Sequence, residues 1–416
     1  MKIEFNLVDL MKAYSIVGVV TPAPIPNGST GYLFVVRGDT CFLYSNGEMA
    51  VARSSFPLIS SEEDGSFVYP AEYMSAFGYL GEETCSMEIT CDTDGKYLIK
   101  YTTSSGAESE RSSFDPLMLS VCDKDLEKAI SDGSHTFQPG ILREAINQAK
   151  PFLGKIGDPK VADNFQGLQI MDAQSGSEAY KKADGFLYVT DGVRIMYVYS
   201  DEFRGKSLEI HGRQLGLFTN FLGKCGTKVT IHKSNTHTFA VSESGDVLGW
   251  PRHSRLHEKF NYYSLTSDTV IVRTSKVRLL AALQHTRKEL ESNLTKIRVH
   301  FDPSTLKMWF SLSEGSAKAK SISVTVEATF QSKDSSVEPT PTPFSVSVNI
   351  DHFIELINHN KNHEIVLRCM VADKNKKQMA LFRTVDEYYL DSQGKLTVEP
   401  EGAFKCQTTR FISSRD

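Results

Sequence analysis

Apolar residues follow two alternating periods along this chain, one helical and one strand-like. Three stretches carry an apolar stripe at helical spacing, and each is followed by short runs in which apolar and polar residues alternate. The stripes are Leu7, Leu10, Met11 and Tyr14; then Leu142, Ala145, Ile146, Ala149 and Phe152; then Leu279, Leu283, Thr286 and Leu290. The pattern predicts three amphipathic helices, the second opened by Pro139 and closed by Gly154.

A second, shorter helix is predicted further along each stretch. Each follows a strand-like run and precedes another segment of strand-like alternation. The predicted helices cover 70–77, 212–218 and 351–357; the strands before them are 67–69, 208–210 and 344–348, and those after them are 86–90, 228–232 and 364–369. Each unit is therefore predicted as α+β, with two helices covering one face of an antiparallel sheet.

A turn motif marks each unit. An apolar run leads into Ser or Thr, then Asp, Asn or Glu, and then Gly, at 42–47, 187–192 and 310–315. A strand followed by a polar residue and Gly predicts a hairpin turn in which the Gly adopts a positive φ. The copies are separated by domain-sized distances, not by the short period of a solenoid.

The chain of 416 residues is long enough for two or three cores. The motifs divide it into three similar domains, at 1–122, 130–264 and 268–416. The third contains an insertion at 335–343 with Pro at every second position near its end. Proline cannot sustain a sheet ladder, so this insertion is predicted as an extended, exposed loop.

Composition narrows the class of protein. No stretch of 18 apolar residues occurs, so no membrane span is expected, and the acidic, amphipathic start does not resemble a signal peptide. The seven cysteines form no CxxC pair, which indicates reduced thiols in a cytosol-like compartment and no metal site. No cofactor is expected.

Charge is distributed unevenly. The whole chain carries −5, whereas residues 1–122 carry −9 and residues 267–416 carry +3. An acidic head and a mildly basic tail could steer head-to-tail association. A merely solvated acidic surface explains the same numbers, and both explanations stay open.

The polar faces of the first helices differ between units. The first has little besides Lys12, whereas the second places Arg143, Asn147 and Lys150 opposite its apolar stripe. The third carries Lys276, Arg278, Gln284, His285, Arg287 and Lys288. These side chains belong either to solvated helix faces or to one concave surface that neutralises phosphates without reading sequence.

Three stretches of the second unit resemble the bacterial β-type DNA polymerase sliding clamp. Residues 190–195, Thr-Asp-Gly-Val-Arg-Ile, are similar to the family's T-D-G-H-R-L. Residues 164–168, Asn-Phe-Gln-Gly-Leu, are similar to its Y-Y-L-N-G strand, and residues 250–256, Trp-Pro-Arg-His-Ser-Arg-Leu, to its F-P-D-Y-R-R-V. Together with the three-unit organisation, the resemblance covers essentially the whole chain.

The resemblance implies a ring. In this family two crescent-shaped subunits close head to tail around duplex DNA, with helices lining the hole and sheets forming the rim. Such a ring is no enzyme: it is a processivity factor that tethers the replicative polymerase and is placed on DNA by a clamp loader. The chain would be a homodimer of the bacterial cytoplasm or nucleoid, or of a phage-infected cell. Carried over by position, the DNA-facing residues are Lys12, Arg143, Asn147, Lys150, Arg278 and Lys288.

The resemblance also implies a pocket between the second and third units, in which partners dock a short peptide with apolar anchors. An apolar floor with one or two Arg side chains at its rim suits an extended peptide. Carried over by position, the pocket comprises Phe165, Thr190, Gly192, Val193, Arg194, Ile195, Pro251, Arg255 and Leu256, with Phe411 and Ile412 as apolar contacts from the chain end.

Three departures from the family pattern indicate a diverged clamp, from a phage or an unusual bacterium. Val193 stands where the family usually has a polar residue, often His. The chain end, 405–414, differs from the family's M-P-M-R-L-like strand. The loop 21–26 is Pro-rich where the family presents an Arg to DNA.

Two other functions stay open from the residues alone. One is a scaffold of the same three-domain form that does not encircle DNA, if the cationic helix residues face no common hole. The other is a hydrolase or phosphoesterase using Asp191 with His232, His237 or His253. The chain has no nucleophile elbow, phosphate-binding loop, HExxH or carboxylate-rich cluster, which favours turn capping as the role of Asp191.

Overall fold

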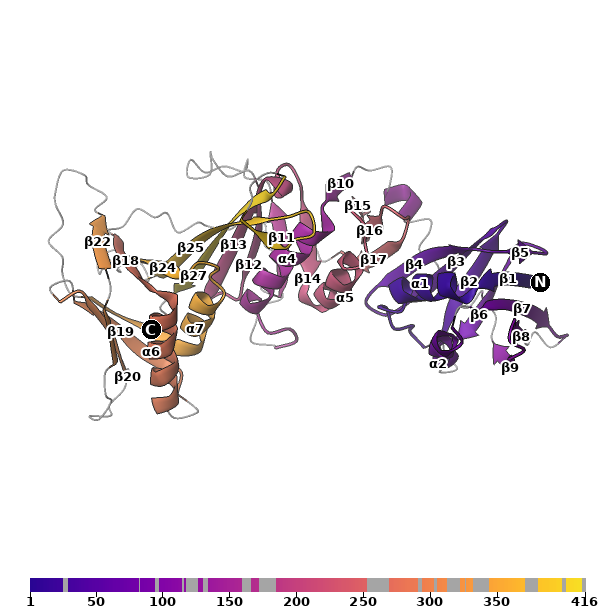
Figure 1. The fold of residues 1–416 in the computed structure, drawn as a ribbon, viewed down its shortest axis with the longest axis horizontal. Coiled ribbons are helices and arrows are strands. Elements are labelled where there is room, and N and C mark those ends of the chain that lie inside the picture. Colours follow the sequence, from indigo (N-terminus) through magenta and orange to yellow (C-terminus); the bar gives the residue numbers. More distant parts are fainter. Residues whose placement is uncertain are drawn as a thin grey trace. The chain divides into compact units, whose positions relative to one another are not determined.

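The fold is α+β, with antiparallel sheets and few helices (Figure 1). The computed structural model describes residues 1–24, 29–81, 83–93, 97–113, 116, 126–129, 134–158, 166–171, 185–252, 269–290, 294–302, 305–312, 322–325, 327–331, 344–370, 381–398 and 402–413. The predicted loop at 335–343 lies outside these residues.

One order of elements recurs three times: a strand, a helix, three strands, a further strand, a second helix and three strands. Repeat 1 comprises β1 (Lys2–Asn6), α1 (Leu7–Val17), β2 (Gly31–Arg37), β3 (Thr40–Asn46), β4 (Val51–Pro57), β5 (Ser60–Ser61), β6 (Gly65–Pro70), α2 (Ala71–Met74), η1 (Ser75–Tyr79), β7 (Thr84–Cys91), β8 (Tyr97–Thr103) and β9 (Glu108–Ser113). The small strand β5 is an addition to this order.

Repeats 2 and 3 follow the same order with their own small additions. Repeat 2 comprises β10 (Ser134–Phe137), α4 (Pro139–Ala149), η3 (Lys150–Phe152), β11 (Gly167–Met171), β12 (Phe186–Thr190), β13 (Arg194–Ser200), η6 (Asp201–Phe203), β14 (Leu208–His211), α5 (Gly212–Leu222), β15 (Val229–Lys233), β16 (His237–Ser242) and β17 (Val247–Pro251). Repeat 3 comprises β18 (Thr269–Ser275), α6 (Lys276–Glu289), β19 (Lys296–Asp302), β20 (Lys307–Leu312), β21 (Ile322–Thr325), β22 (Glu327–Gln331), β23 (Phe344–Asn349), α7 (Ile350–Asn358), β24 (Glu364–Met370), β25 (Leu381–Leu390), β26 (Leu396–Thr397) and β27 (Phe404–Ser413).

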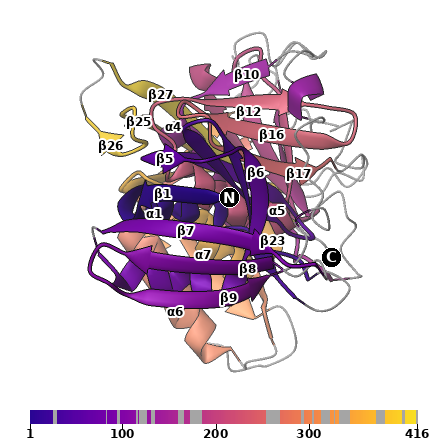
Figure 2. The same cartoon turned by 90° about the vertical axis from the view of Figure 1, so that its right-hand side faces the viewer.

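Neighbouring repeats share sheets through two joins. In the first join, β4 of repeat 1 pairs with β17 of repeat 2, which creates an eight-stranded sheet. In the second join, β13 of repeat 2 pairs with β27 of repeat 3 inside a ten-stranded sheet. The remaining sheets end on β9 and on β21, and Figure 2 shows β9 as the outermost strand beside β8.

Contacts divide the chain into two compact units. The first comprises Met1–Arg143 and Arg213–His253, and the second comprises Glu144–Gly212 and Ser254–Asp416. The first join lies within the first unit and the second join within the second. The limits between the three predicted domains fall outside the described residues and stay a prediction.

Each helix buries an apolar stripe against a sheet. In repeat 3, α6 and α7 lie side by side (Figure 1), and their apolar faces meet the inward residues of β19, β20 and β23 in one core. Strand alternation supplies the other half of this core, because Ile297, Val299 and Phe301 are buried and the residues between them are not. Ile412 of β27 belongs to the same core.

The three long amphipathic helices are confirmed as α1, α4 and α6, although α4 ends at Ala149 and Phe152 lies in the short 3-10 turn η3. The shorter helices at 212–218 and 351–357 are confirmed as α5 and α7. The helix predicted at 70–77 is only partly helical: α2 has four residues and continues as the 3-10 turn η1. Among the described residues no helix is long and apolar enough to cross a membrane.

The glycines of the turn motif differ in conformation. Gly192 has a φ of 87°, as predicted. Gly47 does not lie in the positive-φ region, so that prediction is wrong for the first copy. A Cβ at Gly47 would lie 2.6 Å from the Thr21 carbonyl oxygen, so close backbone approach requires glycine there. The third copy, 313–315, lies outside the described residues.

Candidate functional site

The turn between β12 and β13 is held by its own side chains. The Thr190 hydroxyl donates to the carbonyl oxygen of Arg194 over 2.7 Å and accepts from the amide of Gly192 over 2.9 Å. One carboxylate oxygen of Asp191 accepts from the amides of Val193, at 2.9 Å, and of Arg194, at 2.6 Å. Asp191 therefore caps the turn, as the sequence indicates.

Arg194 ties this turn to helix α7. Its Nε donates to the second carboxylate oxygen of Asp191 over 2.7 Å, and its Nη1 forms an ion pair with Glu355 on α7. The guanidinium carbon lies 5.5 Å from the centre of the Phe152 ring. The Arg194 side chain links repeats 2 and 3 through these contacts. It is only 10% exposed, so it offers little surface to a partner.

His352 lies beside this ion-pair cluster. Burial lowers the pKa of His352, and the positive charge of Arg194 lowers it further, while Asp191 and Asp351 act in the opposite direction. The shift favours the neutral form of the ring. Glu355, the partner of Arg194 on α7, has a side chain that is 44% exposed.

Strand β27 fixes the place of the chain end. Arg194 faces Ile412 and Ile195 faces Phe411 across the pairing of β13 with β27. Because successive strand residues point to opposite faces, Arg194 and Ile412 share the helix-covered face and Ile195 lies on the other. Ile412 is 1% exposed and belongs to the repeat-3 core. Gly192, Val193 and Ile195 are partly exposed.

The structure brings together part of the predicted pocket. Thr190, Gly192, Val193, Arg194, Ile195 and Ile412 lie at one end of the second join. Pro251 ends β17 in the first unit and is exposed. Phe165, Arg255 and Leu256 lie outside the described residues, as does the side chain of Phe411.

Sequence reasoning missed a buried polar network beneath the second join. The carboxylate of Asp386 on β25 accepts from Arg410 on β27 over 2.6 Å, and neither side chain has exposed surface. The hydroxyl of Tyr388 donates to Gln148 on α4 over 2.9 Å and lies 3.0 Å from the Thr408 hydroxyl. The only sequence signal was the placement of polar residues at inward positions of strands.

The predicted DNA-facing side chains are exposed on their helices. Lys12 on α1 pairs with Asp9 over 3.2 Å. Arg143, Asn147 and Lys150 are exposed on α4 and its 3-10 extension. On α6, Arg278 and Lys288 are exposed, and among the residues described neither forms an ion pair. Arg287 instead pairs with Asp351 over 2.8 Å, and Lys276 donates to two carbonyl oxygens at the end of α7.

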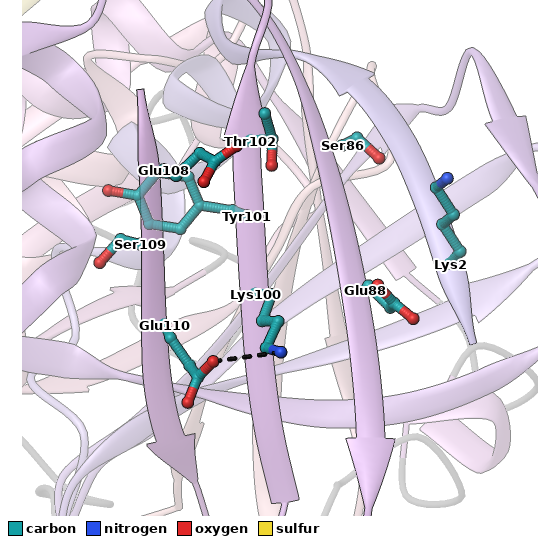
Figure 3. Close-up of a pocket in the computed structure, with 9 residues that line it drawn as sticks. All are labelled: Lys2, Ser86, Glu88, Lys100, Tyr101, Thr102, Glu108, Ser109 and Glu110. Atoms are coloured by element: carbon teal, nitrogen blue, oxygen red, sulfur yellow. Dashed lines mark ion pairs between the residues drawn. The ribbon is translucent and has the colours of Figure 1, made fainter. Parts of the chain in front are cut away.

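A polar depression of about 430 Å³ lies on the five-stranded sheet of repeat 1 (Figure 3). Cross-strand neighbours alternate in charge along one row, from Lys2 through Glu88 and Lys100 to Glu110. Lys100 and Glu110 form an ion pair over 3.3 Å. The row ends on β9, the strand at the sheet edge, which also carries Glu108.

Asp191 and the histidines named with it in the sequence have these places in the structure. Within the described ranges, no group of three or more His, Cys, Asp and Glu could hold a metal ion. Both carboxylate oxygens of Asp191 already accept hydrogen bonds from the turn and from Arg194. His232 and His237 lie on β15 and β16, and His253 lies outside the described residues.

Three strand–helix repeats that share sheets through β4–β17 and β13–β27 define the DNA clamp fold, three similar α+β domains in one chain. No protein-family model matches the sequence. No curated protein matches it either.

Solved structures of bacterial clamps match over the full length. DNA polymerase III subunit beta from Pseudomonas aeruginosa is 13% identical with a TM-score of 0.69, and both chains are covered completely. A putative DNA polymerase III beta subunit from Eubacterium rectale is 15% identical with a TM-score of 0.69, again with complete coverage of both chains. The DNA polymerase sliding clamp from Bacillus subtilis is 13% identical with a TM-score of 0.69, over 100% of this chain and 99% of that one. The expected fold is confirmed.

Proposed function

We propose that this chain is a non-catalytic sliding clamp: two copies close head to tail around duplex DNA and tether a polymerase and other replication proteins. The observation that carries the proposal is the repetition of one strand pairing. The third strand of the first sheet in repeats 1 and 2, β4 or β13, pairs with the last strand of the following repeat, β17 or β27. The corresponding strands at the chain's two ends are β21 and β9, and each ends a sheet. A second copy supplies the partner for both.

The carboxylates on the edge strand β9 are opposite in charge to cations of the sheet that ends on β21. The edge strand β9 carries Glu108 and Glu110 on the solvent face of its sheet. The sheet that ends on β21 carries exposed Lys296, Arg298 and Lys307. Opposite charges across a seam speed association and fix its orientation. These residues contribute to the charge asymmetry between the two ends of the sequence.

Non-specific DNA contact is assigned to exposed helix cations. Arg143, Lys150, Arg278 and Lys288 stand on helices and lack ion-pair partners among the described residues. Their small number suits a protein that must slide, since each phosphate contact adds to affinity and to salt dependence. Partner docking is assigned to the surface around Val193 and Ile195 at the second join, with Pro251, Arg255, Leu256, Phe165 and Phe411 as further expected contacts.

Oligomeric state is the first test. Sedimentation should find a dimer of the 46.4 kDa chain, held more tightly at low salt. Glu108→Lys with Glu110→Lys should shift it toward monomer, and adding Lys307→Glu should restore part of the affinity. A matched control, Glu48→Lys with Glu62→Lys, changes the same charge away from β9. A persistent monomer at micromolar concentration contradicts the ring.

Topology is the second test. The protein, loaded on nicked circular DNA, should remain bound and should leave after the circle is cut. Equal residence on circular and linear DNA would show that the chain does not encircle DNA and would favour the scaffold function. Arg278→Ala with Lys288→Ala should weaken loading without changing the dimer, because both side chains are exposed.

A further inference from the structure

The solvent face of the repeat-3 sheet carries a stacked aromatic pair. Strands β19 and β20 are neighbours (Figure 1). His300 on β19 and Trp309 on β20 face each other across them, with ring centres 5.1 Å apart and planes 7° from parallel. Both side chains are partly exposed. A hydrogen-bonding contact of 2.6 Å between His300 Nε2 and the Ser311 hydroxyl fixes the imidazole ring.

The positions flanking this pair are serines. In the row across the four strands, Ser345 on β23 lies beyond His300, and Ser323 on β21 is the register partner of Trp309. Ser345 is exposed. Serine is too small to cover an aromatic ring, so Ser345 leaves the outer face of the His300 ring accessible for stacking.

Cations flank the pair along the strands. Arg298 is two residues from His300 on β19, and Lys307 is two residues from Trp309 on β20. Side chains two residues apart share a sheet face, about 7 Å apart. Both cations are exposed, and Lys296 is exposed one step further along β19. Asp302, opposite Lys307, is the one acidic residue among the described β19 and β20 residues of this face.

The imidazole contributes as a neutral ring. Burial lowers the pKa of His300, and the neighbouring Arg298 lowers it further. The positive charge of the face therefore belongs to the two flanking side chains and does not depend on the aromatic row.

We propose that this face binds single-stranded nucleic acid, with bases stacking on the His300–Trp309 pair and phosphates meeting the cations on either side. Stacking platforms with basic flanks are the means by which sheets hold single strands without sequence preference. Duplex DNA hides the faces of its bases, and an acidic peptide would use the cations alone. The proposal goes beyond the clamp function, although it draws on Arg298 and Lys307, which the proposed seam also uses as charge partners of Glu108 and Glu110 of a second copy.

Intrinsic fluorescence provides the test. Trp250, the other tryptophan, is 1% exposed, so oligo(dT) binding to the full-length protein should quench Trp309. Trp309→Ala should weaken binding about 5- to 150-fold, measured by polarisation of labelled oligo(dT), while Trp309→Phe should retain most of it. Arg298→Ala with Lys307→Ala should reduce the slope of log affinity against log salt by about 1.4.

Controls separate this site from the clamp function. Arg278→Ala with Lys288→Ala should leave oligo(dT) binding unchanged, even though duplex loading falls. Equal binding of a blunt duplex, or equal competition by poly-glutamate, would overturn the proposal, and so would full affinity in Trp309→Ala. Unaltered thermal unfolding of Trp309→Phe and of the Arg298→Ala/Lys307→Ala variant would show that any loss is not caused by misfolding.

Discussion

The two joins within the chain use the same strand pairing but are built differently. At the first, β4 and β17 pair over three residue pairs, and at the second, β13 and β27 pair over seven. Beneath the second lie the buried Asp386–Arg410 ion pair and the Tyr388–Gln148 hydrogen bond. The first is supported by a small apolar cluster and by a hydrogen bond from Ser54 to Asp246. One strand arrangement thus supports both a simple apolar contact and a polar, ion-paired site.

The largest loss of unfolding free energy is expected when the buried Asp386–Arg410 ion pair is removed. Asp386→Ala leaves the Arg410 charge buried without a partner and should cost about 3–5 kcal/mol of unfolding free energy, measured by urea titration. Glu387→Ala is the matched control, because Glu387 pairs with Lys405 at the surface over 3.2 Å and its loss should cost under about 1 kcal/mol. If both substitutions lower the unfolding free energy equally, the buried ion pair stabilises the second join no more than a surface ion pair does.

Adding a single methyl group at Gly249 should weaken the first join. A Cβ at Gly249 would lie 2.7 Å from the Phe239 ring and 2.9 Å from Val51 of β4. Gly249→Ala should therefore cost about 1–3 kcal/mol and speed hydrogen exchange in β4 and β17 but not in β13 or β27. Gly216→Ala on α5 meets no atom within 4 Å and serves as the control. Faster exchange at both joins would contradict their independence.

Removing one hydroxyl should weaken the second join moderately. Tyr388→Phe deletes the hydrogen bond to Gln148 and should cost about 0.5–1.5 kcal/mol. Tyr389→Phe, on the opposite face of the same strand, should change stability less. If the two variants have the same unfolding free energy, the hydrogen bond between Tyr388 on β25 and Gln148 on α4 contributes nothing measurable to stability.

The smallest expected effect is a pH dependence of the unfolding free energy of the second unit. The pKa of His359 is lowered from 6.5 by burial, and further by Arg410, Lys361, Lys276 and Arg194. The unfolded state therefore binds more protons than the folded state just below pH 6.5, so unfolding free energy should fall as the pH drops through that region. His359→Gln should flatten this slope between pH 7.5 and 5.5, measured by urea titration at each pH. A slope of the opposite sign would contradict the assignment.

Local patterns predicted local structure well. Helical spacing identified α1, α4 and α6, and the Asp191–Gly192 motif identified a turn with the expected glycine conformation. The 70–77 segment is a partial exception, because four helical residues and a 3-10 turn bury the same Met74 and Phe77 that a longer helix would.

Long-range partners could not be predicted from the chain. Arg194 was expected at a pocket rim, yet Glu355, far along the sequence, holds it in place. Nothing in the period of an alternating strand specifies which strand of another repeat it will pair with. The solvent-face stack of His300 and Trp309 likewise depends on the register of β19 with β20.

In the proposed assembly, β9 and β21, each of which ends a sheet among the described strands, give every chain two different ends that can bind a further copy. A unit with two different complementary ends either closes into a ring or continues as an open filament, and the rotation between successive units decides which. In the proposed assembly, the pairings β4–β17 and β13–β27 lie between these two ends and contribute to that rotation. Substitutions that alter the shorter join, such as Gly249→Ala, should therefore be examined for larger assemblies as well as for loss of stability.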